Sequence, residues 1–324
     1  MKKFSPYTDL ALEAAEALTV NEQEQEGIEL SCESSEAAEI TTVKITNEEG
    51  SRKTGKPRGS YITIESPYMR ENTPELHEEI KKTLAKSLAQ LCPLKENDSV
   101  LVVGLGNRYV TPDSLGPKVI SGILVTRHIK ENLPGELKDS VRPVAAVTPG
   151  VMGLTGIESA EIIKGIAERI RPSAIIAIDA LAARKATRIN TTLQLADTGV
   201  TPGAGVGNTR GALNRETMGV PVIAIGVPTV VDAATLVNDS LNSIIGSMRE
   251  ASKSGSEFYK MLEDLSAEEK YSLISECLDP YTENMFVTPK EVDSVVESLA
   301  DIISGGINMA LHEGINSENV NKVI

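Results

Sequence analysis

The run from Val100 to Val103 constrains the fold of this 324-residue chain more than any other feature. It is a continuous stretch of β-branched and other apolar residues that ends at two glycines, Gly104 and Gly106. Such a run is typical of a strand buried on both faces, as in a parallel sheet covered by helices. The same rhythm of apolar run, loop and amphipathic segment repeats through residues 144–246. The sequence therefore predicts an α/β fold, a three-layer sandwich with a mostly parallel sheet between helices.

Apolar periodicity gives the expected elements. Strands are expected at residues 40–45, 61–64, 100–103, 144–147, 174–178, 191–195 and 220–225. Helices are expected at residues 74–91, 114–128, 157–170, 227–246 and 289–308. Residues 21–39 are acidic and rich in Glu, Gln and Ser, which favours a weakly ordered arm. We expect one domain over residues 10–324, with the polar residues 251–285 as a peripheral insertion.

Composition limits the partners and the compartment. The net charge of −14 excludes a broad nucleic-acid surface, because phosphate binding needs clustered Lys and Arg. Cys32, Cys92 and Cys277 lack the spacing of a metal site or a disulfide framework, which indicates a reducing compartment. Acidic residues interrupt the apolar N-terminal stretch, and apolar runs are too short to span a bilayer. We expect a soluble, cytoplasmic protein that does not bind membranes.

Asp113 and Asp179 form the candidate catalytic pair. Each follows the expected carboxyl end of a strand in the same predicted sheet, where ligands bind in open α/β folds. Two carboxylates that lie close together can share a proton, so that one activates water while the other donates to a carbonyl. The alternative is that Asp113 caps a helix and Asp179 caps a turn, since aspartate is common at both places.

Glycines near the first strand resemble a dinucleotide-binding fingerprint, but the pattern fails. It needs a third glycine three residues after Gly106, and that position is Tyr109. Gly104, Gly106 and Asn107 are therefore possible pocket residues, where glycine lets the backbone approach a peptide or an oxyanion. Tight turns explain the same glycines equally well.

The tripeptide Asp197-Thr198-Gly199 is the local signature of pepsin-like proteases. That family brings together two copies on an almost entirely β fold, whereas this chain has one copy and alternates helices with strands. The tripeptide is more simply a turn, and Asp197 is kept as a possible pocket residue.

Metal chemistry has few candidate ligands. His77, His128 and His312 lie in three separate helical patterns and lack the H-E-x-x-H spacing of zinc proteases. We therefore expect no metal site and no cofactor. The G-x-S-x-G elbow of serine hydrolases is missing as well, which leaves paired carboxylates as the hydrolytic device.

At these residues the chain resembles the germination protease family of endospore-forming bacteria. The similar segments follow the family's order and cover nearly the whole chain. They are YTDLALEA (7–14), GKPRGSYITIESP (55–67), VLVVGLGNRYVTPDSLGP (100–117), LVTRHI (124–129), RPVAAVTPGVMGLTGIESAEIIKGI (142–166), IIAIDALAAR (175–184), INTTLQLADTGVTPGAGVGNTRGALNRETMGVPVIAIGVPTVVDAAT (189–235), MFVTPKEVD (285–293) and ISGGINMALH (303–312).

The resemblance implies an endopeptidase of the forespore and spore core that degrades small acid-soluble spore proteins during germination. It also implies a zymogen, a homotetramer and a fold similar to the hydrogenase maturation endopeptidases. By motif, the two proposed catalytic aspartates of the family fall on Asp113 in TPDSLGP and Asp179 in IAIDALAA. These are the residues that the strand-end argument selects.

The resemblance further implies that a short propeptide is removed autocatalytically, at a site like the substrate sequence Thr-Glu-Ile/Phe-Ala-Ser-Glu. The segment from Thr8 to Glu13, TDLALE, imitates that pattern with Asp for Glu and Leu for Ser. The predicted cut is between Asp9 and Leu10, which makes residues 1–9 the propeptide. The alternative is that this segment is only the start of an amphipathic helix.

Two other functions stay open. One is metal-dependent peptide cleavage like that of the hydrogenase maturation endopeptidases. The other is a non-catalytic protein that binds the spore proteins in the same crevice and forms stable complexes without cleavage.

Overall fold

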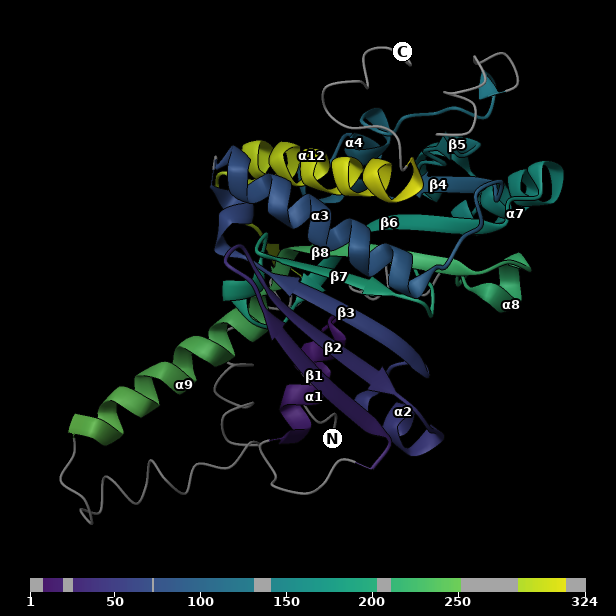
Figure 1. The fold of residues 1–324 in the computed structure, drawn as a ribbon. Helices are drawn as coiled ribbons and strands as arrows, with labels where there is room; N and C mark the ends of the chain where they lie inside the picture. Colours follow the sequence, from purple (N-terminus) through teal and green to yellow (C-terminus); the bar gives the residue numbers. More distant parts are fainter. Residues whose placement is uncertain are drawn as a thin grey trace.

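The computed structural model describes residues 8–19, 26–71, 73–130, 141–202, 211–251 and 285–312. The beginning of the expected propeptide (residues 1–7) and most of the expected insertion (residues 252–284) lie outside these residues. The described chain folds around one large sheet with helices on both faces (Figure 1). This agrees with the predicted α/β class.

Within the described residues, nine strands form a sheet in the order β1-β2-β3-β7-β8-β6-β4-β5, and β9 pairs with β8. The strands are β1 (Ile28–Ser34), β2 (Glu39–Ile45), β3 (Gly59–Glu65), β4 (Val100–Gly104), β5 (Val144–Val147), β6 (Ala174–Ala183), β7 (Thr192–Ala196), β8 (Val222–Asp232) and β9 (Phe286–Val287).

The sheet is mixed, which corrects the expectation of a mostly parallel one. The pairs β4 with β5, β4 with β6, and β6 with β8 are parallel. The pairs β1 with β2, β2 with β3, β3 with β7, β7 with β8, and β8 with β9 are antiparallel. The apolar runs predicted the parallel half, because its strands are buried on both faces. In the antiparallel half, β1 and β2 are more exposed and more polar, whereas β7 is fully buried.

Two layers of helices cover the sheet. The first layer is α3 (Pro74–Leu91), α4 (Leu115–Ser121) and α12 (Val292–Leu311), which pack on Val100, Val102 and their neighbours (Figure 1). On the opposite face, α7 (Ser159–Ile170) packs on Leu101 and Val103, while α1 (Ala11–Thr19) packs on Val43 and neighbouring strand residues. The short helices are α2 (Glu48–Thr54), α6 (Met152–Thr155), α8 (Arg215–Met218), η1 (Pro67–Arg70), η2 (Thr111–Asp113) and η4 (Ala186–Arg188).

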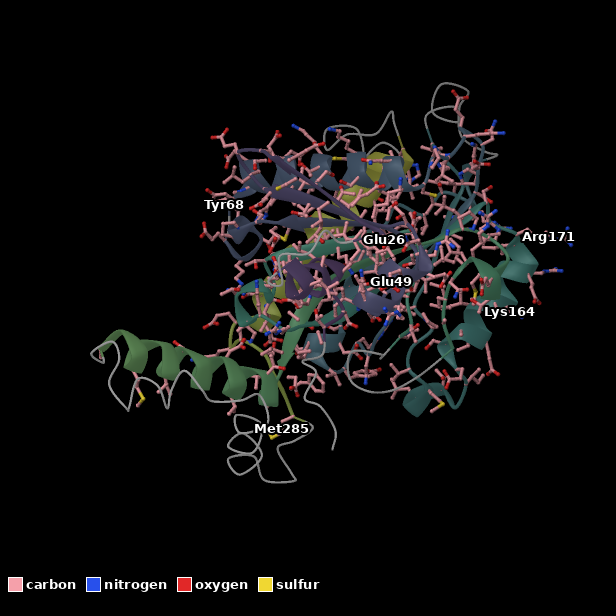
Figure 2. All side chains as sticks on the ribbon, turned by 90° about the horizontal axis from the view of Figure 1, so that it is seen from below. Glu26, Glu49, Tyr68, Lys164, Arg171 and Met285 are labelled. Carbon is pink, nitrogen blue, oxygen red and sulfur yellow. The ribbon has the colours of Figure 1, made fainter. Side chains whose placement is uncertain are left out.

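The outer faces of these helices are polar, as amphipathic helices require. Lys164 of α7 and Arg171 just after it project outward at the edge of the molecule (Figure 2). The helix α9 (Ala233–Ala251) extends away from the rest of the described chain in both views (Figures 1 and 2). None of the helices in the described part is long and apolar enough to cross a membrane.

The helix expected at residues 114–128 ends earlier, at Ser121. Beyond it, the backbone N–H groups of Leu124 and Thr126 donate to residues distant in sequence and no longer to carbonyls within the helix. The backbone N–H of Leu124 donates to Oδ1 of Asn308 at 2.9 Å, and that of Thr126 donates to the carbonyl of Val144 at 3.0 Å. By contrast, α3 and β5 begin and end where the sequence pattern placed them.

Two central strands are longer than expected. The strand β6 continues to Ala183, so Asp179 lies within it and not beyond its end. The strand β8 continues to Asp232, so the helix expected from residue 227 begins only at Ala233. The two strands pair along their whole extensions, with one irregularity between Leu181 and Ala182. Alanine favours helices, but in the extension of β6 cross-strand hydrogen bonding overrides the helix propensity of Ala180, Ala182 and Ala183.

Candidate functional site

A cavity of about 670 Å³ lies on the face of the sheet covered by α1. Its floor includes Asp179, Gly226 and Gln194, and its rim includes residues 8 and 9 and the turn at residues 53–57. The cavity thus contains one of the two predicted aspartates and one side of the predicted cleavage bond.

Three floor residues lie in one row across the sheet. Asp179 of β6 pairs with Gly226 of β8, which in turn pairs with Gln194 of β7. Side chains of directly paired residues stand on the same face of a sheet. Gly226 has no side chain, and Leu181 packs over it so closely that an added Cβ would lie 2.5 Å from Cδ1 of Leu181. The two polar side chains stand about two strand spacings apart, roughly 10 Å. Asp179 and Gln194 are both buried, and Oδ1 of Asp179 accepts from the N–H of Ala180 at 3.0 Å.

Asp9 lies against the extension of β6. Its backbone N–H donates to the carbonyl of Ala182 at 3.0 Å, and its Oδ2 accepts from the N–H of Ala182 at 2.8 Å. One residue of the segment therefore satisfies both main-chain groups of Ala182. This contact depends on the continuation of β6 past Asp179.

Gln194 holds the chain on both sides of Leu10. Its Nε2 donates to the carbonyl oxygen of Asp9 at 3.3 Å, and its Oε1 accepts from the N–H of Ala11 at 2.7 Å. Leu10 itself is fully buried. The predicted cleavage bond is therefore fixed in position by side-chain and backbone contacts from β6 and β7.

Lys56 and Thr8 fix the chain before this bond. The Nζ of Lys56 donates to the carbonyl of Thr8 at 2.8 Å, and Oγ1 of Thr8 accepts from the N–H of Leu10 at 3.0 Å. Burial lowers the pKa of Lys56, although the nearby carboxylates of Asp9 and Glu13 work in the opposite direction.

Glu13 lies in a buried pocket built for a carboxylate. Its oxygens accept from the N–H groups of Arg184 at 2.8 Å and Lys185 at 2.9 Å, and from the hydroxyl of Thr8. The guanidinium of Arg188 lies 3.6 Å from Oε1 of Glu13. The turn after β6 thus binds the residue that lies four positions beyond the predicted cut.

Arg188 connects this pocket to two further carboxylates. It donates to Glu16 at 2.6 Å and to Glu65 at 2.8 Å. Burial alone would lower the pKa of Arg188, but the hydrogen bonds to Glu16 and Glu65 outweigh it and raise that pKa. The guanidinium therefore stays charged where it faces Glu13.

Asp113 lies in η2, beyond the end of β4. Its Oδ2 and its carbonyl both accept from the N–H of Asn107, at 2.8 Å and 3.0 Å. The turn folds back over Gly106, whose φ is +105° and where an added Cβ would lie 2.1 Å from the carbonyl oxygen of Asp113. Glycine is thus required here for Asp113 to return to the sheet.

The position of η2 is fixed from neighbouring strands. The N–H of Leu105 donates to the carbonyl of Ile178 at 2.8 Å, and the hydroxyl of Thr229 donates to the carbonyl of Pro112 at 2.7 Å. Asp113 therefore lies next to β6 and β8, at the carboxyl edge of the parallel strands. Among the described residues that line the 670 Å³ cavity, Asp179 is present and Asp113 is not.

The other predicted pocket residues have local contacts in the described structure. Gly104 faces α4, where an added Cβ would lie 2.3 Å from the carbonyl oxygen of Gly116. Oδ1 of Asn107 accepts from the N–H of Tyr109 at 3.1 Å. Asp197 lies in the turn after β7, and its Oδ1 accepts from the N–H of Ser60 at 2.8 Å.

The histidines lie apart from one another. His77 is buried and contacts the carbonyl of Tyr68 at 2.9 Å, whereas His128 is exposed. Burial lowers the pKa of His312 to about 4. Within the ranges that the structure describes, His, Cys, Asp and Glu form no cluster of three that could hold a metal ion.

Sequence reasoning missed the residues that hold the segment from Thr8 to Glu13. Ala182, Arg184 and Lys185 act through their backbone N–H groups, which sequence cannot assign. Gln194 could have been noticed in the sequence, because it is a polar residue within the otherwise largely apolar strand TLQLA. A buried amide within such a strand needs partners, and here the partners are the two peptide groups around Leu10.

Comparison with known proteins gives the same family over nearly the whole chain. The sequence profile of the germination protease family matches residues 7–257 and 250–323. A germination protease of Caldanaerobacter subterraneus subsp. tengcongensis is 49% identical over 98% of this chain and 97% of its own length. That of Clostridium tetani is 46% identical over 98% of both chains, and that of Bacillus cereus is 41% identical over 98% of this chain and 97% of its own.

Proposed function

This chain belongs to the germination protease family, and on that premise we propose that it is an endopeptidase that cuts its own chain between Asp9 and Leu10. The arrangement of residues 8–13 carries the proposal. The bond between Asp9 and Leu10 is bracketed by contacts to Ala182 and Gln194, in the cavity that contains Asp179. Capping of α1, which begins at Ala11, accounts for the bond to the N–H of Ala11, but the contacts of the Asp9 peptide groups lie before the helix.

In the proposed reaction, Asp179 and Asp113 share the acid and base roles. One carboxylate takes a proton from a water molecule, whose oxygen attacks the carbonyl carbon of Asp9. The other carboxyl group donates a proton to the nitrogen of Leu10, and the bond between that carbon and nitrogen breaks. The products are a carboxylic acid at Asp9 and a free amine at Leu10. The nearness of η2 to β6 and β8 supports this assignment.

The proposed substrates in trans are small acid-soluble spore proteins that carry the sequence Thr-Glu-Ile/Phe-Ala-Ser-Glu. The chain's own segment supports this, because Thr8, Asp9 and Glu13 stand where that sequence has Thr, Glu and Glu. The pocket around Glu13 would bind the second glutamate of the substrate. We infer that the protein is made as a zymogen in the forespore, and that it acts in the spore core once residues 1–9 are removed.

Two isosteric variants test the proposed catalytic pair. Asp113→Asn and Asp179→Asn should each fold, yet neither should process itself or cut a peptide that contains Thr-Glu-Ile-Ala-Ser-Glu. Asp197→Asn is the matched control, because its amide oxygen can still accept from Ser60 outside the cavity. Mass spectrometry of the purified proteins identifies the new N-terminus. Normal processing by either of the first two variants would remove that residue from the mechanism.

Two further arms of the same experiment separate the alternatives. Loss of wild-type cleavage in the presence of a chelator, restored by added metal, would favour the metal-dependent reaction. A stable complex with intact substrate would favour the non-catalytic binder. Under the proposed function, cleavage continues with chelator and the complex does not accumulate.

We also propose the homotetramer of the resemblance. Three apolar side chains are exposed close together in sequence: Met152 and Leu154 on α6, and Ile157 between α6 and α7. Their exposure supports an interface between copies. Light scattering on the wild type and on Leu154→Asp tests this. A tetrameric wild type and a smaller variant are expected, and a monomeric wild type would contradict the proposal.

A further inference from the structure

The amide of Gln194 has a fixed orientation. The N–H of Ala11 can only donate, so the group that faces it at 2.7 Å must be Oε1. Nε2 then faces the carbonyl oxygen of Asp9 at 3.3 Å, and it must donate there. Both contacts agree with one orientation of the amide. Nε2 of Gln194 is thus an N–H donor aimed at the carbonyl of the bond that the proposed function cleaves.

The sheet places this donor in the same row as Asp179, one of the two proposed acid–base carboxylates. Gln194, Gly226 and Asp179 occupy one row on one face, with the glycine between the two polar side chains. The carbonyl of Asp9 lies on the Gln194 side of this row, because it is the amide that contacts it. Asp179, the other polar side chain of the row, lines the same cavity as Gln194 and Asp9, so the carboxylate and the donor face one common space.

The chemistry of amide hydrolysis gives this donor a task. When water adds to the carbonyl carbon of Asp9, the electron pair of the C=O bond moves onto oxygen, which becomes an oxyanion. A preorganised N–H donor in a buried site stabilises that charge without reorganisation. Ground-state hydrogen bonds at such sites are often long and shorten as charge develops, which fits the 3.3 Å separation.

From this geometry we propose that Gln194 is a catalytic residue, whose Nε2–H stabilises the oxyanion formed at the Asp9 carbonyl. Its Oε1 fixes the register of the peptide through Ala11. The inference rests on the proposed function, because it takes Asp9–Leu10 as the cleaved bond. The electron pair returns to the carbonyl when the bond to the Leu10 nitrogen breaks, so Gln194 neither gains nor loses a proton.

Two variants of the full chain separate donation from positioning. Gln194→Glu keeps the length of the side chain and an oxygen for Ala11, but it loses the N–H donor. Gln194→Met keeps the length and loses both contacts. Thr192→Val is the matched control, because Thr192 is buried two residues earlier on the same strand. Loss of one oxyanion donor reduces turnover about 10²–10³-fold in other hydrolases.

The readouts are the first-order rate of self-cleavage and the hydrogen exchange of residues 8–19. Gln194→Glu should process about 10²-fold more slowly or worse, with exchange of the segment close to that of the wild type. Gln194→Met should process slowly and also exchange faster, and Thr192→Val should match the wild type in both. Circular dichroism and the thermal midpoint confirm that each variant is folded.

Two results would overturn the inference. One is a Gln194→Glu rate within about threefold of the wild type, a smaller loss than an oxyanion donor causes. The other is a rate loss in Gln194→Glu that is matched by fast exchange, which would make Gln194 only a holding residue. Failure of the proposed function looks different, because the wild type itself would then leave the Asp9–Leu10 bond intact.

Discussion

Glu13 and Arg188 form an ion pair at 3.6 Å, and their side chains are only 1% and 9% exposed. The N–H groups of Arg184 and Lys185 complete the contacts of the carboxylate. A buried charge is stable only when it is paired and hydrogen-bonded in this way. The pair therefore ties the segment that contains the predicted cut to the turn that follows β6.

Glu13→Gln should weaken this attachment and slow self-cleavage. The oxygen of the new amide can accept from one of the N–H groups of Arg184 and Lys185. Its NH₂ group then faces the other N–H, and two donors cannot form a hydrogen bond. A hydrogen bond to a charged group contributes about 1.5–3 kcal/mol, so the rate should fall roughly 10- to 100-fold. Time courses of processing followed by mass spectrometry measure it. Glu16→Gln is the control, because Glu16 contacts the same arginine from a half-exposed position. Equal losses in the two variants would contradict a specific role for Glu13.

Gly226→Ala should also block the site. A Cβ at this position would lie 2.5 Å from Cδ1 of Leu181, which lines the cavity. Leu181 would have to move into the space beside the cleavage bond, and self-cleavage should slow at least tenfold. Leu181→Ala should restore much of the rate in the double variant, because it removes the clashing atoms. A Gly226→Ala protein that processes normally would show that the close packing of Leu181 on Gly226 is not needed.

Gly104→Ala tests the packing of α4 on β4. The new Cβ would lie 2.3 Å from the backbone oxygen of Gly116, and backbone atoms cannot rotate away as a side chain can. Overpacking of this kind costs typically about 1–3 kcal/mol of unfolding free energy. Urea denaturation gives the loss. Gly165→Ala is the control, because a Cβ there meets no atom within 4 Å and the helix α7 should become slightly more stable.

His312 should make stability depend on pH. Its Nδ1 accepts from the N–H of Arg142 at 3.2 Å, so the fold favours the neutral ring, and burial lowers its pKa to about 4. The unfolded chain protonates near the ordinary pKa of about 6.5. Between these values the unfolded state binds more protons, so stability falls as the pH falls from 6.5 towards 4.

His312→Gln removes this titration. The difference in unfolding free energy between the wild type and this variant should change by on the order of 3 kcal/mol between pH 7 and pH 4. Urea denaturation at several pH values measures it. His128→Gln provides the comparison, because that histidine is exposed. A difference that stays constant across this range would show that His312 does not titrate as its burial requires.

The sequence predicted the elements whose residues carry a periodic or continuous apolar pattern. The helix Pro74–Leu91 and the strand Val144–Val147 are of this kind. The strand β1 gave no such signal, because six of its seven residues are exposed and its sequence, IELSCES, is acidic and polar. Its pairing with β2 depends on a neighbour in space, and the acidic composition suggested an unstructured arm instead.

The site, like the fold, has parts that the sequence pattern predicts and parts that depend on neighbours in space. Strand patterns pointed to Asp179, and the structure places it in the lining of the 670 Å³ cavity. Its role with Asp113 stays a prediction. Asp9 is bound by backbone groups in the last part of β6, and Glu13 by backbone groups just after it. Gln194 contacts the peptide groups on both sides of Leu10. These groups are brought together only by the antiparallel placement of β7 beside β8, which local sequence does not encode.

The way Asp9 and Ala11 are held has a consequence for what the site can accept. Their N–H groups donate to Ala182 and Gln194, and the Asp9 carbonyl accepts from Gln194. In a helix, these same peptide groups are occupied by partners within the chain. A polypeptide that is stably folded around the target bond must therefore unfold there before it can bind. Under the proposed function, the site would therefore discriminate between proteins by their local folding free energy, and a protein that is stably folded at its target bond would not be cut.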